Sequence, residues 1–199
     1  LLTPIVKAFM TDNGWIATSE AMQVHGGSGF ITGTGVEQYV RDARINMIYE
    51  GTNTIQSLDL LGRKILMDNG AKLKKFGALV QAFVEENGTD EAMSEFVTPL
   101  ADLGDKVTKL TMEIGMKAMQ NQDEVGAAAV PYLRVVGHLV YSYFFARMAK
   151  IALAKLDSGD NFYKAKLATA RFYFARLLPE TAMLIRQARS GAKPLLDLE

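Results

Sequence analysis

Apolar residues recur at alternating intervals of three and four along residues 100–114, and this pattern constrains the fold more than any other feature of the chain. The residues are Leu100, Leu103, Val107, Leu110 and Ile114. Such spacing places the side chains on one face of an α-helix, and that face is stable only when it packs against other elements. Because no stretch alternates apolar and polar residues as a strand would, the sequence predicts an all-α helical bundle.

The same periodicity predicts helices along the whole chain, separated by turn signals. The expected helices of the first part span residues 4–24, 36–47 and 53–66, with a loop over 26–35 between the first two. Asp68-Asn69-Gly70 is the best candidate boundary, because it is a turn signal between helical patterns. Beyond it the pattern predicts antiparallel helices with short links, the last of them bent at Pro179. We therefore divide the chain into residues 1–67 and an additional helical bundle over residues 68–199.

Composition excludes several classes of function. The chain has 199 residues, 49% of them hydrophobic, which suffices for one or two domains with a core. Its 22 basic and 22 acidic residues cancel, so no overall field attracts nucleic acid or an anionic membrane. The longest apolar stretch, residues 135–146, is interrupted by polar residues and is too short to span a bilayer. The absence of cysteine excludes disulfides and thiolate metal sites and favours a cytoplasmic protein, and two scattered histidines predict no metal site.

The two ends of the chain carry expectations of their own. The opening Leu1-Leu2-Thr3-Pro4 lacks the basic and long apolar regions of a signal peptide. The missing initiator methionine indicates that residue 1 is not the natural start. We expect the closing Leu198-Glu199 to be a vector remnant, so it is left out of the fold prediction.

Residues 23–56, QVHGGSGFITGTGVEQYVRDARINMIYEGTNTIQ, concentrate glycine next to a carboxylate in an unusual setting. Glu50 stands between the apolar pair Ile48-Tyr49 and Gly51-Thr52, where a backbone can approach a ligand closely. A carboxylate that is partly desolvated in such a setting can act as a general base. The alternative is that Glu50 is a surface turn residue or an acid at a helix N-terminus. Residue type and spacing alone leave both interpretations open.

The order of the sequence blocks in this stretch resembles the C-terminal helical domain of the flavin-dependent acyl-CoA dehydrogenases. The blocks that carry the resemblance are Gln-x-x-Gly-Gly-x-Gly-Phe from Gln23, then Val36-Glu37, Arg41-Asp42-Ala43-Arg44-Ile45 and Ile48-Tyr49-Glu50-Gly51-Thr52. The resemblance extends from Pro4 to about Leu66. The remaining helices resemble the extra C-terminal region of the longer family members, of the methylthiopropionyl-CoA dehydrogenase type.

The resemblance implies a role for each block. In this family a glutamate removes the proton next to the thioester carbonyl while a hydride leaves the next carbon for FAD, and Glu50 holds the position of that base. The backbone N–H of Glu50 is implied as a donor to the carbonyl oxygen, and Gly51 as the substrate-binding position that leaves room for the acyl group. The residues implied to contact FAD, the first three of them in a neighbouring subunit, are Gln23, Gly26, Gly27 and Thr52.

Other residues of the chain have structural interpretations. Gly26-Gly27 is also a plain helix C-cap and Thr52 a plain N-cap. We expect Asp42 to pair with Arg41 or Arg44 and so to orient the helix that leads to the base. His138 lies among valines and predicts a core or interface histidine. The aromatic runs over residues 141–145 and 172–174 predict the core of the bundle, with one side available to an oligomer interface.

As a whole, the resemblance implies the base-bearing, C-terminal part of an FAD-dependent acyl-CoA dehydrogenase of fatty acid metabolism. Its implied partners are an acyl-CoA substrate, an electron acceptor such as electron-transfer flavoprotein, and further copies of itself in a homo-oligomer. Because the family places an N-terminal helical domain and a β-domain ahead of this segment, we expect the chain alone to be inactive and to lack FAD. One alternative is a helical oligomerisation or interaction module without catalysis of its own. Another is a scaffold in which Glu50 is no longer used.

Overall fold

A computed structural model describes residues 1–197 of the chain, and the expected vector remnant, Leu198-Glu199, lies outside the described residues. Residues 1–197 form helices and turns and contain no strand, which confirms the predicted all-α bundle. None of the helices in this range combines the length and apolar character needed to cross a membrane.

The first part of the chain folds into a long helix, a return helix and a shorter helix. Its elements are α1 (Leu2–Pro4), the π-helical η1 (Ile5–Phe9), α2 (Met10–Val24), α3 (Gly27–Phe30), the 3-10 turn η2 (Thr32–Thr34), α4 (Val36–Ile45), α5 (Asn53–Leu58) and the π-helical η3 (Asp59–Leu66). The helix expected over residues 4–24 is therefore present. The second helix ends at Ile45 and not at Met47, because the chain turns there, and the expected loop over 26–35 contains the short helices α3 and η2.

The second part of the chain supplies the predicted antiparallel helices. Its elements are α6 (Ala71–Asn87), α7 (Glu91–Gln120), α8 (Asp123–Leu153), the 3-10 turn η4 (Leu156–Ser158), α9 (Asn161–Phe172), the π-helical η5 (Tyr173–Leu177), α10 (Glu180–Arg189) and α11 (Lys193–Leu196). The expected break at Pro179 falls between η5 and α10. The predicted stripe from Leu100 to Ile114 is buried along α7. Asp90 caps this helix, because its side chain accepts a hydrogen bond from the N–H of Ala92 at 2.9 Å.

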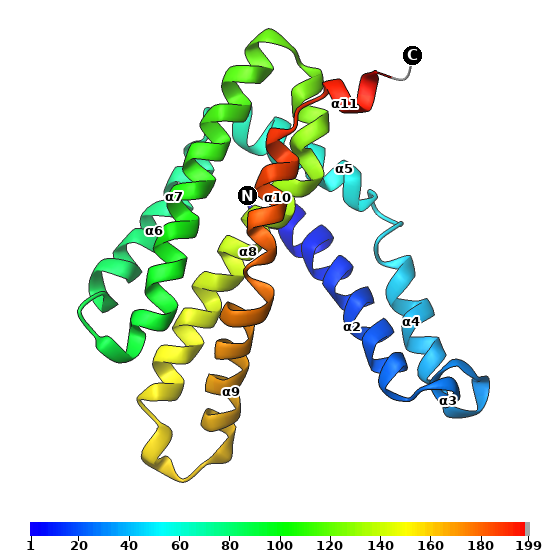
Figure 1. Ribbon diagram of the computed structural model, residues 1–199, viewed down its shortest axis with the longest axis vertical. Coiled ribbons are helices and arrows are strands. Elements are labelled where there is room, and N and C mark those ends of the chain that lie inside the picture. Colours follow the sequence, from blue (N-terminus) through cyan, green and yellow to red (C-terminus); the bar gives the residue numbers. More distant parts are fainter. Residues whose placement is uncertain (198–199) are drawn as a thin grey trace.

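Helical hairpins extend from a common junction, as Figure 1 shows: α2 with α4, α6 with α7, and α8 with α9. The junction is formed where the first helix and α5 pack against the first half of α8. There the ring of Phe9 makes edge contacts with His138 and Tyr141, at centroid distances of 4.9 and 4.8 Å. The two parts of the chain thus share one apolar core. A turn at residues 67–70 separates η3 from α6, while the division into domains at that turn stays a prediction.

The hairpin of α2 and α4 differs from the other two hairpins because neither of its helices contains a buried residue. Tyr39 of α4 is 67% exposed, and Phe30 at the tip of the hairpin is 74% exposed. Apolar side chains that neither helix of the hairpin covers are typical of a surface that packs against another molecule or another part of a longer chain.

The aromatic runs form much of the core, as predicted, with two exceptions. Tyr173 is buried, and its ring stacks on Phe145 at a centroid distance of 4.3 Å. Phe144 and Phe172 are instead 45% and 57% exposed. The prediction was wrong for these two because consecutive residues of a helix point in different directions, so an unbroken aromatic run cannot lie entirely on the buried side.

Candidate functional site

The turn between α4 and α5 carries the predicted base. It begins as α4 ends, where the N–H groups of Ile48 and Tyr49 both donate to the carbonyl of Ile45, at 3.0 and 3.2 Å. It closes where the N–H of Asn53 donates to the carbonyl of Met47 at 3.2 Å. Glu50 lies midway along this turn and is exposed. The structure therefore places its carboxylate on a defined surface turn and not inside a helix.

The backbone at Glu50 is in an unusual conformation. Glu50 has φ +53° and Gly51 has φ +85°, so both are in the left-handed region. Residues with a Cβ adopt this region at a cost of about 1–2 kcal/mol, whereas glycine adopts it freely. A glycine at position 51 is thus required by the turn itself. At position 50 a glutamate holds this left-handed conformation, although a glycine would adopt the same conformation without strain. Strained backbone conformations of this kind are concentrated at functional sites.

The polar groups of Glu50 make few contacts within the chain. None of the ion pairs within residues 1–197 includes its carboxylate, and its backbone N–H donates to no acceptor in the same range. Only its carbonyl has a partner, the amide of Gln56 at 3.5 Å. The carboxylate and the N–H are therefore both free to meet a ligand. Because Glu50 is exposed, desolvation of its carboxylate requires something that covers the turn from outside residues 1–197.

Thr52 is the N-cap residue of α5, but its hydroxyl makes no capping hydrogen bond. It lines a cavity of about 340 Å³ beneath the turn. This cavity also brings together Asp12 from α2, Arg44 from α4, and Leu133 and Arg134 from α8. The second part of the chain therefore forms one wall of the pocket next to Glu50.

The other predicted FAD contacts lie at the far end of α4, away from Glu50. Gln23 is exposed in the last turn of α2, and Gly26 with φ +59° joins α2 to α3. A Cβ at Gly26 or Gly27 would meet no atom within 4 Å, so the backbone there is open. Figure 1 shows α3 at the tip of the hairpin and α5 at the junction. The structure thus joins Glu50, Gly51 and Thr52 in one turn and holds Gln23, Gly26 and Gly27 in another.

The pairing expected for Asp42 was wrong. Its carboxylate accepts a hydrogen bond from the amide of Gln38 at 2.7 Å, and it forms no ion pair within residues 1–197. On a helix the residues three and four positions apart face each other, so Gln38 is within reach whereas Arg41 and Arg44 point elsewhere. Arg44 instead lies over the ring of Trp15, with 5.9 Å between the guanidinium carbon and the ring centroid. This contact joins α4 to α2.

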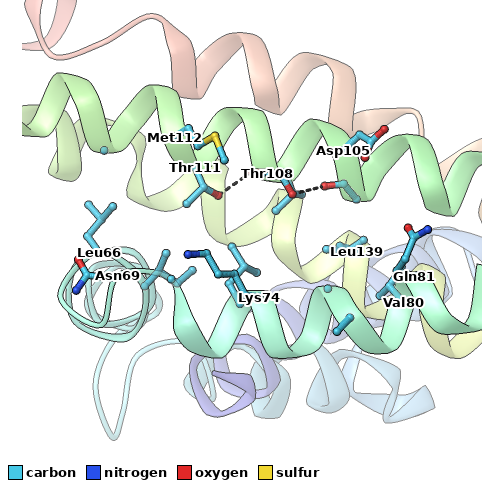
Figure 2. A pocket seen from close by; sticks show the side chains of 18 of the residues that line it. Leu66, Asn69, Lys74, Val80, Gln81, Asp105, Thr108, Thr111, Met112 and Leu139 are labelled. Carbon is cyan, nitrogen blue, oxygen red and sulfur yellow. Dashed lines mark hydrogen bonds between the residues drawn. The ribbon is translucent and has the colours of Figure 1, made fainter.

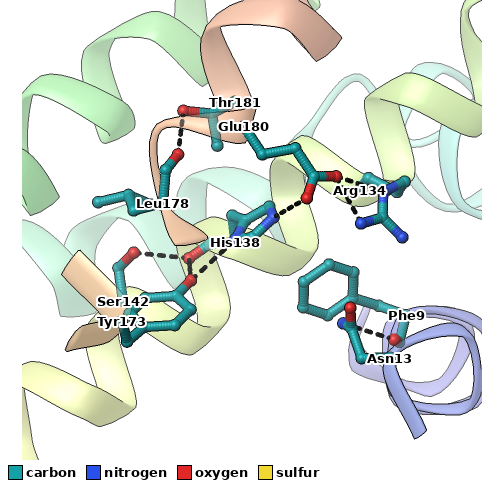
Figure 3. A network of polar contacts seen from close by, with 9 residues as sticks. All are labelled: Phe9, Asn13, Arg134, His138, Ser142, Tyr173, Leu178, Glu180 and Thr181. Atoms are coloured by element: carbon teal, nitrogen blue, oxygen red, sulfur yellow. Dashed lines mark hydrogen bonds and ion pairs between the residues drawn. The ribbon is translucent and has the colours of Figure 1, made fainter. Parts of the chain in front are cut away.

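A buried polar network connects α8 to α10, and Figure 3 shows its members. His138 is 3% exposed, as expected for a core histidine, and its Nδ1 lies 2.9 Å from the hydroxyl of Tyr173. Arg134 donates from Nε to a carboxylate oxygen of Glu180 at 2.8 Å, and also from Nη2. The second carboxylate oxygen of Glu180 is 3.8 Å from Nε2 of His138, too far for a hydrogen bond. The network is a structural link between helices and uses the only buried histidine of residues 1–197.

The charge of Glu180 is stabilised by this network. The pKa of its carboxyl is lowered from 4.5 to about 2, by His138 and by Arg134, against its partial burial, which raises the pKa. We attribute most of the lowering to Arg134, because its hydrogen bonds are short whereas the His138 contact is 3.8 Å long. Glu180 is therefore ionised in the folded chain at neutral pH.

A groove of about 800 Å³ lies between α6 and α7, far from the turn that carries Glu50. Figure 2 shows apolar residues such as Val80 and Leu139 along it, with Lys74 extending into it and Asp105 at its edge. The threonines of its wall donate to carbonyls of their own helix. The groove has no arrangement of acid, base and nucleophile. No cluster of three metal-ligating side chains occurs in the part of the chain that the structure describes.

Asn53 is the member of the site that the sequence prediction missed. Its side chain contacts Lys7, Ala8, Thr11 and Asp12, which are 41–46 residues away in the sequence. The sequence predicted only that a helix begins at Asn53. No spacing rule predicts contacts between residues so far apart, and the one available signal was an amide directly after the candidate base motif.

Comparison with known proteins gives matches to both parts of the chain. Residues 2–66 match the family described as "Acyl-CoA dehydrogenase, C-terminal domain", and residues 76–199 match the family described as "Acetyl-CoA dehydrogenase C-terminal like". The match over 76–199 is consistent with the predicted resemblance of the later helices to an extra C-terminal region.

Curated relatives match most of the chain. The broad-specificity linear acyl-CoA dehydrogenase FadE5 of Mycobacterium tuberculosis is 35% identical over an alignment of 193 residues, and the match covers 90% of this chain and 31% of that protein. The 3-methylmercaptopropionyl-CoA dehydrogenase of Ruegeria pomeroyi is 36% identical over 182 residues, again 90% of this chain and 31% of the relative. A butyryl-CoA dehydrogenase of Syntrophomonas wolfei is 32% identical over 186 residues. The chain spans less than a third of the length of the first two.

Proposed function

Because the chain belongs to the acyl-CoA dehydrogenase family, we propose that it is the C-terminal part of an FAD-dependent enzyme in which Glu50 is the general base. The observation that carries this proposal is the strained, exposed turn at Glu50. A glutamate in a left-handed conformation precedes a glycine in the same region, and both its carboxylate and its N–H lack partners within residues 1–197. A simple surface turn would not require a glutamate at a position that favours glycine.

In the proposed reaction the Glu50 carboxylate accepts the proton of the carbon next to the thioester carbonyl. The hydrogen on the following carbon leaves as a hydride, so the product is an α,β-unsaturated thioester. When bound, FAD supplies the hydride acceptor. The free N–H of Glu50 supports a second role for this residue, donation of a hydrogen bond to the carbonyl oxygen as negative charge develops there. Gly51 leaves the space beside the acyl group open.

The residues proposed to hold FAD are exposed, so a ligand such as FAD can reach them. The backbone at Gly26 and Gly27 is open, the side chain of Gln23 is exposed, and the hydroxyl of Thr52 makes no capping hydrogen bond. The N–H of Gly26 donates to the carbonyl of Gln23 at 3.0 Å, whereas that of Gly27 has no acceptor within residues 1–197 and is suited to a phosphate oxygen. Because the first three lie at the other end of α4 from Thr52, we propose that they contact FAD bound in a neighbouring subunit.

The chain by itself is proposed to be inactive. It spans 31% of the length of its relatives, and nothing within residues 1–197 covers the Glu50 carboxylate. We therefore expect the purified chain to lack FAD and to reduce no electron acceptor, such as electron-transfer flavoprotein, when acyl-CoA is added. The absorbance spectrum of the purified chain tests this, since a flavin band would contradict it.

The general base is tested by single-turnover reduction of FAD in the full-length enzyme, with acyl-CoA thioesters of several chain lengths. Glu50→Gln keeps the shape of the side chain but cannot accept the proton, so the rate constant should fall about 10²- to 10⁴-fold. Glu91→Gln is the matched control, because Glu91 is an exposed acid at the start of α7. Unchanged reduction by Glu50→Gln would remove this residue from its proposed role.

A second function, assembly through the hairpin of α2 and α4, is favoured by a separate observation. The tip and outer side of this hairpin expose Phe30, Ile31 and Tyr39 to solvent, by 74%, 58% and 67%. We propose that this surface packs against another copy or against the rest of the longer enzyme. Light scattering of the chain alone distinguishes these two partners. Self-association at micromolar concentration supports contact with another copy, and a stable monomer supports contact with the rest of the longer enzyme.

A further inference from the structure

Asn53 closes the turn that carries Glu50 and anchors its end to the first helix. Its backbone N–H closes the turn onto the carbonyl of Met47 at 3.2 Å, and its own carbonyl accepts a hydrogen bond from the Ser57 hydroxyl at 2.9 Å. Within residues 1–197, the hydrogen bonds that tie residues 48–52 to the following helix are two more, both from Gln56: its side chain to the carbonyl of Glu50 at 3.5 Å and its N–H to the carbonyl of Thr52 at 3.0 Å. The position of Glu50 therefore depends on how firmly Asn53 is held.

The side chain of Asn53 binds to the first helix through two neighbours of opposite charge, one cationic and one anionic. Its amide oxygen accepts from the ammonium of Lys7 at 2.8 Å, and its amide nitrogen donates to a carboxylate oxygen of Asp12 at 2.6 Å. The same nitrogen lies 3.2 Å from the carbonyl of Ala8 and 3.0 Å from the hydroxyl of Thr11. Lys7 can only donate and Asp12 only accept, so these two neighbours fix the orientation of the amide.

This arrangement requires an amide at position 53. An aspartate there would still pair with Lys7, but it would place a second carboxylate against Asp12 and could not donate to it. An alanine would break all the contacts with the first helix and leave these half-buried polar groups without their partner. A helix cap alone would be served by several other residue types, and Thr52 already occupies the cap position.

We propose that Asn53 is a positioning residue for Glu50, acting through the closed turn and without contact to substrate. The proposal rests on the function proposed above for Glu50. The left-handed conformations of Glu50 and Gly51 persist only if the ends of the turn are held. When the anchor is lost the carboxylate moves from its place, and a displacement of about 1 Å at a reacting group lowers a rate about a hundredfold.

The test is the rate constant of FAD reduction per bound FAD, measured in the full-length enzyme at saturating acyl-CoA. Asn53→Ala and Asn53→Asp should lower this constant about ten- to a hundredfold, while the Kd for acyl-CoA from the same titration changes less than about threefold. A residue important only for folding would reduce the FAD content and the melting temperature but not the rate per bound FAD. Asn46→Ala is the control, because within residues 1–197 the side chain of Asn46 bonds only to the carbonyl of Asp42, so this variant should keep the wild-type rate.

An exchange of the two partners gives an independent check. Asp12→Asn combined with Asn53→Asp restores a donor facing an acceptor and keeps the pair with Lys7. The rate constant of this double variant should therefore be at least tenfold higher than that of Asn53→Asp alone. Wild-type rates in both Asn53 variants, with Glu50→Gln inactive in the same assay, would overturn the inference and leave the proposed base intact. Wild-type reduction by Glu50→Gln would overturn both. A fall in FAD content with an unchanged rate per FAD, or an exchange that recovers nothing, would also overturn the positioning role.

Discussion

The ring of Phe9 lies directly against the main chain of Gly137. A Cβ placed on Gly137 would be 2.5 Å from Cγ of Phe9, a separation that real Cβ atoms do not reach. Phe9 is fully buried, and its ring also makes edge contacts with His138 and Tyr141. The first helix can therefore approach α8 only because residue 137 has no side chain. This contact joins the part of the chain that carries Glu50 to the bundle.

We expect Gly137→Ala to destabilise the chain by about 1–3 kcal/mol, because the added methyl group overpacks the contact with Phe9. The matched control is Gly126→Ala in the same helix, where a Cβ would meet nothing within 4 Å. That variant should gain about 0.5–1 kcal/mol from the better helix propensity of alanine. Urea unfolding of wild type and of the two variants measures both changes in the free energy of unfolding. Equal stabilities for the two variants would contradict the close approach of Phe9 to Gly137.

The helices of the bundle could be predicted because their signals are local. The stripe from Leu100 to Ile114 is periodic over five positions, so its helix followed from residue order alone. The position of Glu50 in a turn before Gly51 was predicted for the same reason. A left-handed conformation at Glu50 was not predicted, since glutamate has no preference for it.

The contacts that hold the site together were not predictable because they join distant residues. Asn53 meets residues 41–46 positions away, and Phe9 packs against α8 from the other end of the chain. Local rules fix which side of a helix is apolar, but not which other helix covers it or whether any does. The helix α4 shows this limit, because it was predicted correctly as a helix and yet its Tyr39 is 67% exposed.

The ion pair of Glu180 with Arg134 predicts a pH dependence of stability. The pKa of Glu180 is lowered to about 2 in the folded chain, so its contribution is fully present above the ordinary value of 4.5 and is lost as the pH falls towards 2. Its side chain is 33% exposed, so we discount the contribution for solvent screening to about 1–2 kcal/mol. Glu180→Gln should therefore be less stable than wild type by this amount at pH 7, and the difference should shrink between pH 4.5 and pH 2.

Urea unfolding at pH 7, 5 and 3 measures this difference. The control is Glu113→Gln, which removes the exposed pair with Arg189 and should cost less than about 1 kcal/mol. A constant difference between wild type and Glu180→Gln over the whole pH range would show that the loss comes from packing and not from the charge.

A hydrogen bond between α7 and α8 predicts a measurable coupling. The hydroxyls of Thr111 and Tyr132 are 2.7 Å apart, and Tyr132 is fully buried. Burial raises the pKa of Tyr132 well above 10, so the phenol is neutral and able to donate. Thr111→Val and Tyr132→Phe should each destabilise the chain, and a double-mutant cycle should give a coupling of about 1 kcal/mol. A coupling near zero would contradict a hydrogen bond between these two side chains.

The strained conformation of Glu50 predicts that the chain gains stability when this residue is lost. Glu50→Gly relieves a left-handed φ of +53°, and the relief of about 1–2 kcal/mol exceeds the entropy cost of glycine in the unfolded chain, about 0.5–1 kcal/mol. Asn69→Gly is the comparison, since Asn69 has φ +55° in the turn before α6. Asparagine tolerates this region better than glutamate, so its replacement should gain less.

Urea unfolding of the purified chain checks the order of the two gains without any need for FAD or substrate. A higher stability in Glu50→Gly than in Asn69→Gly means that the chain retains a destabilising glutamate at the turn, as expected if its carboxylate is kept for chemistry. A Glu50→Gly variant less stable than wild type would mean that the glutamate supports the turn, and the argument from strain to function would then fail.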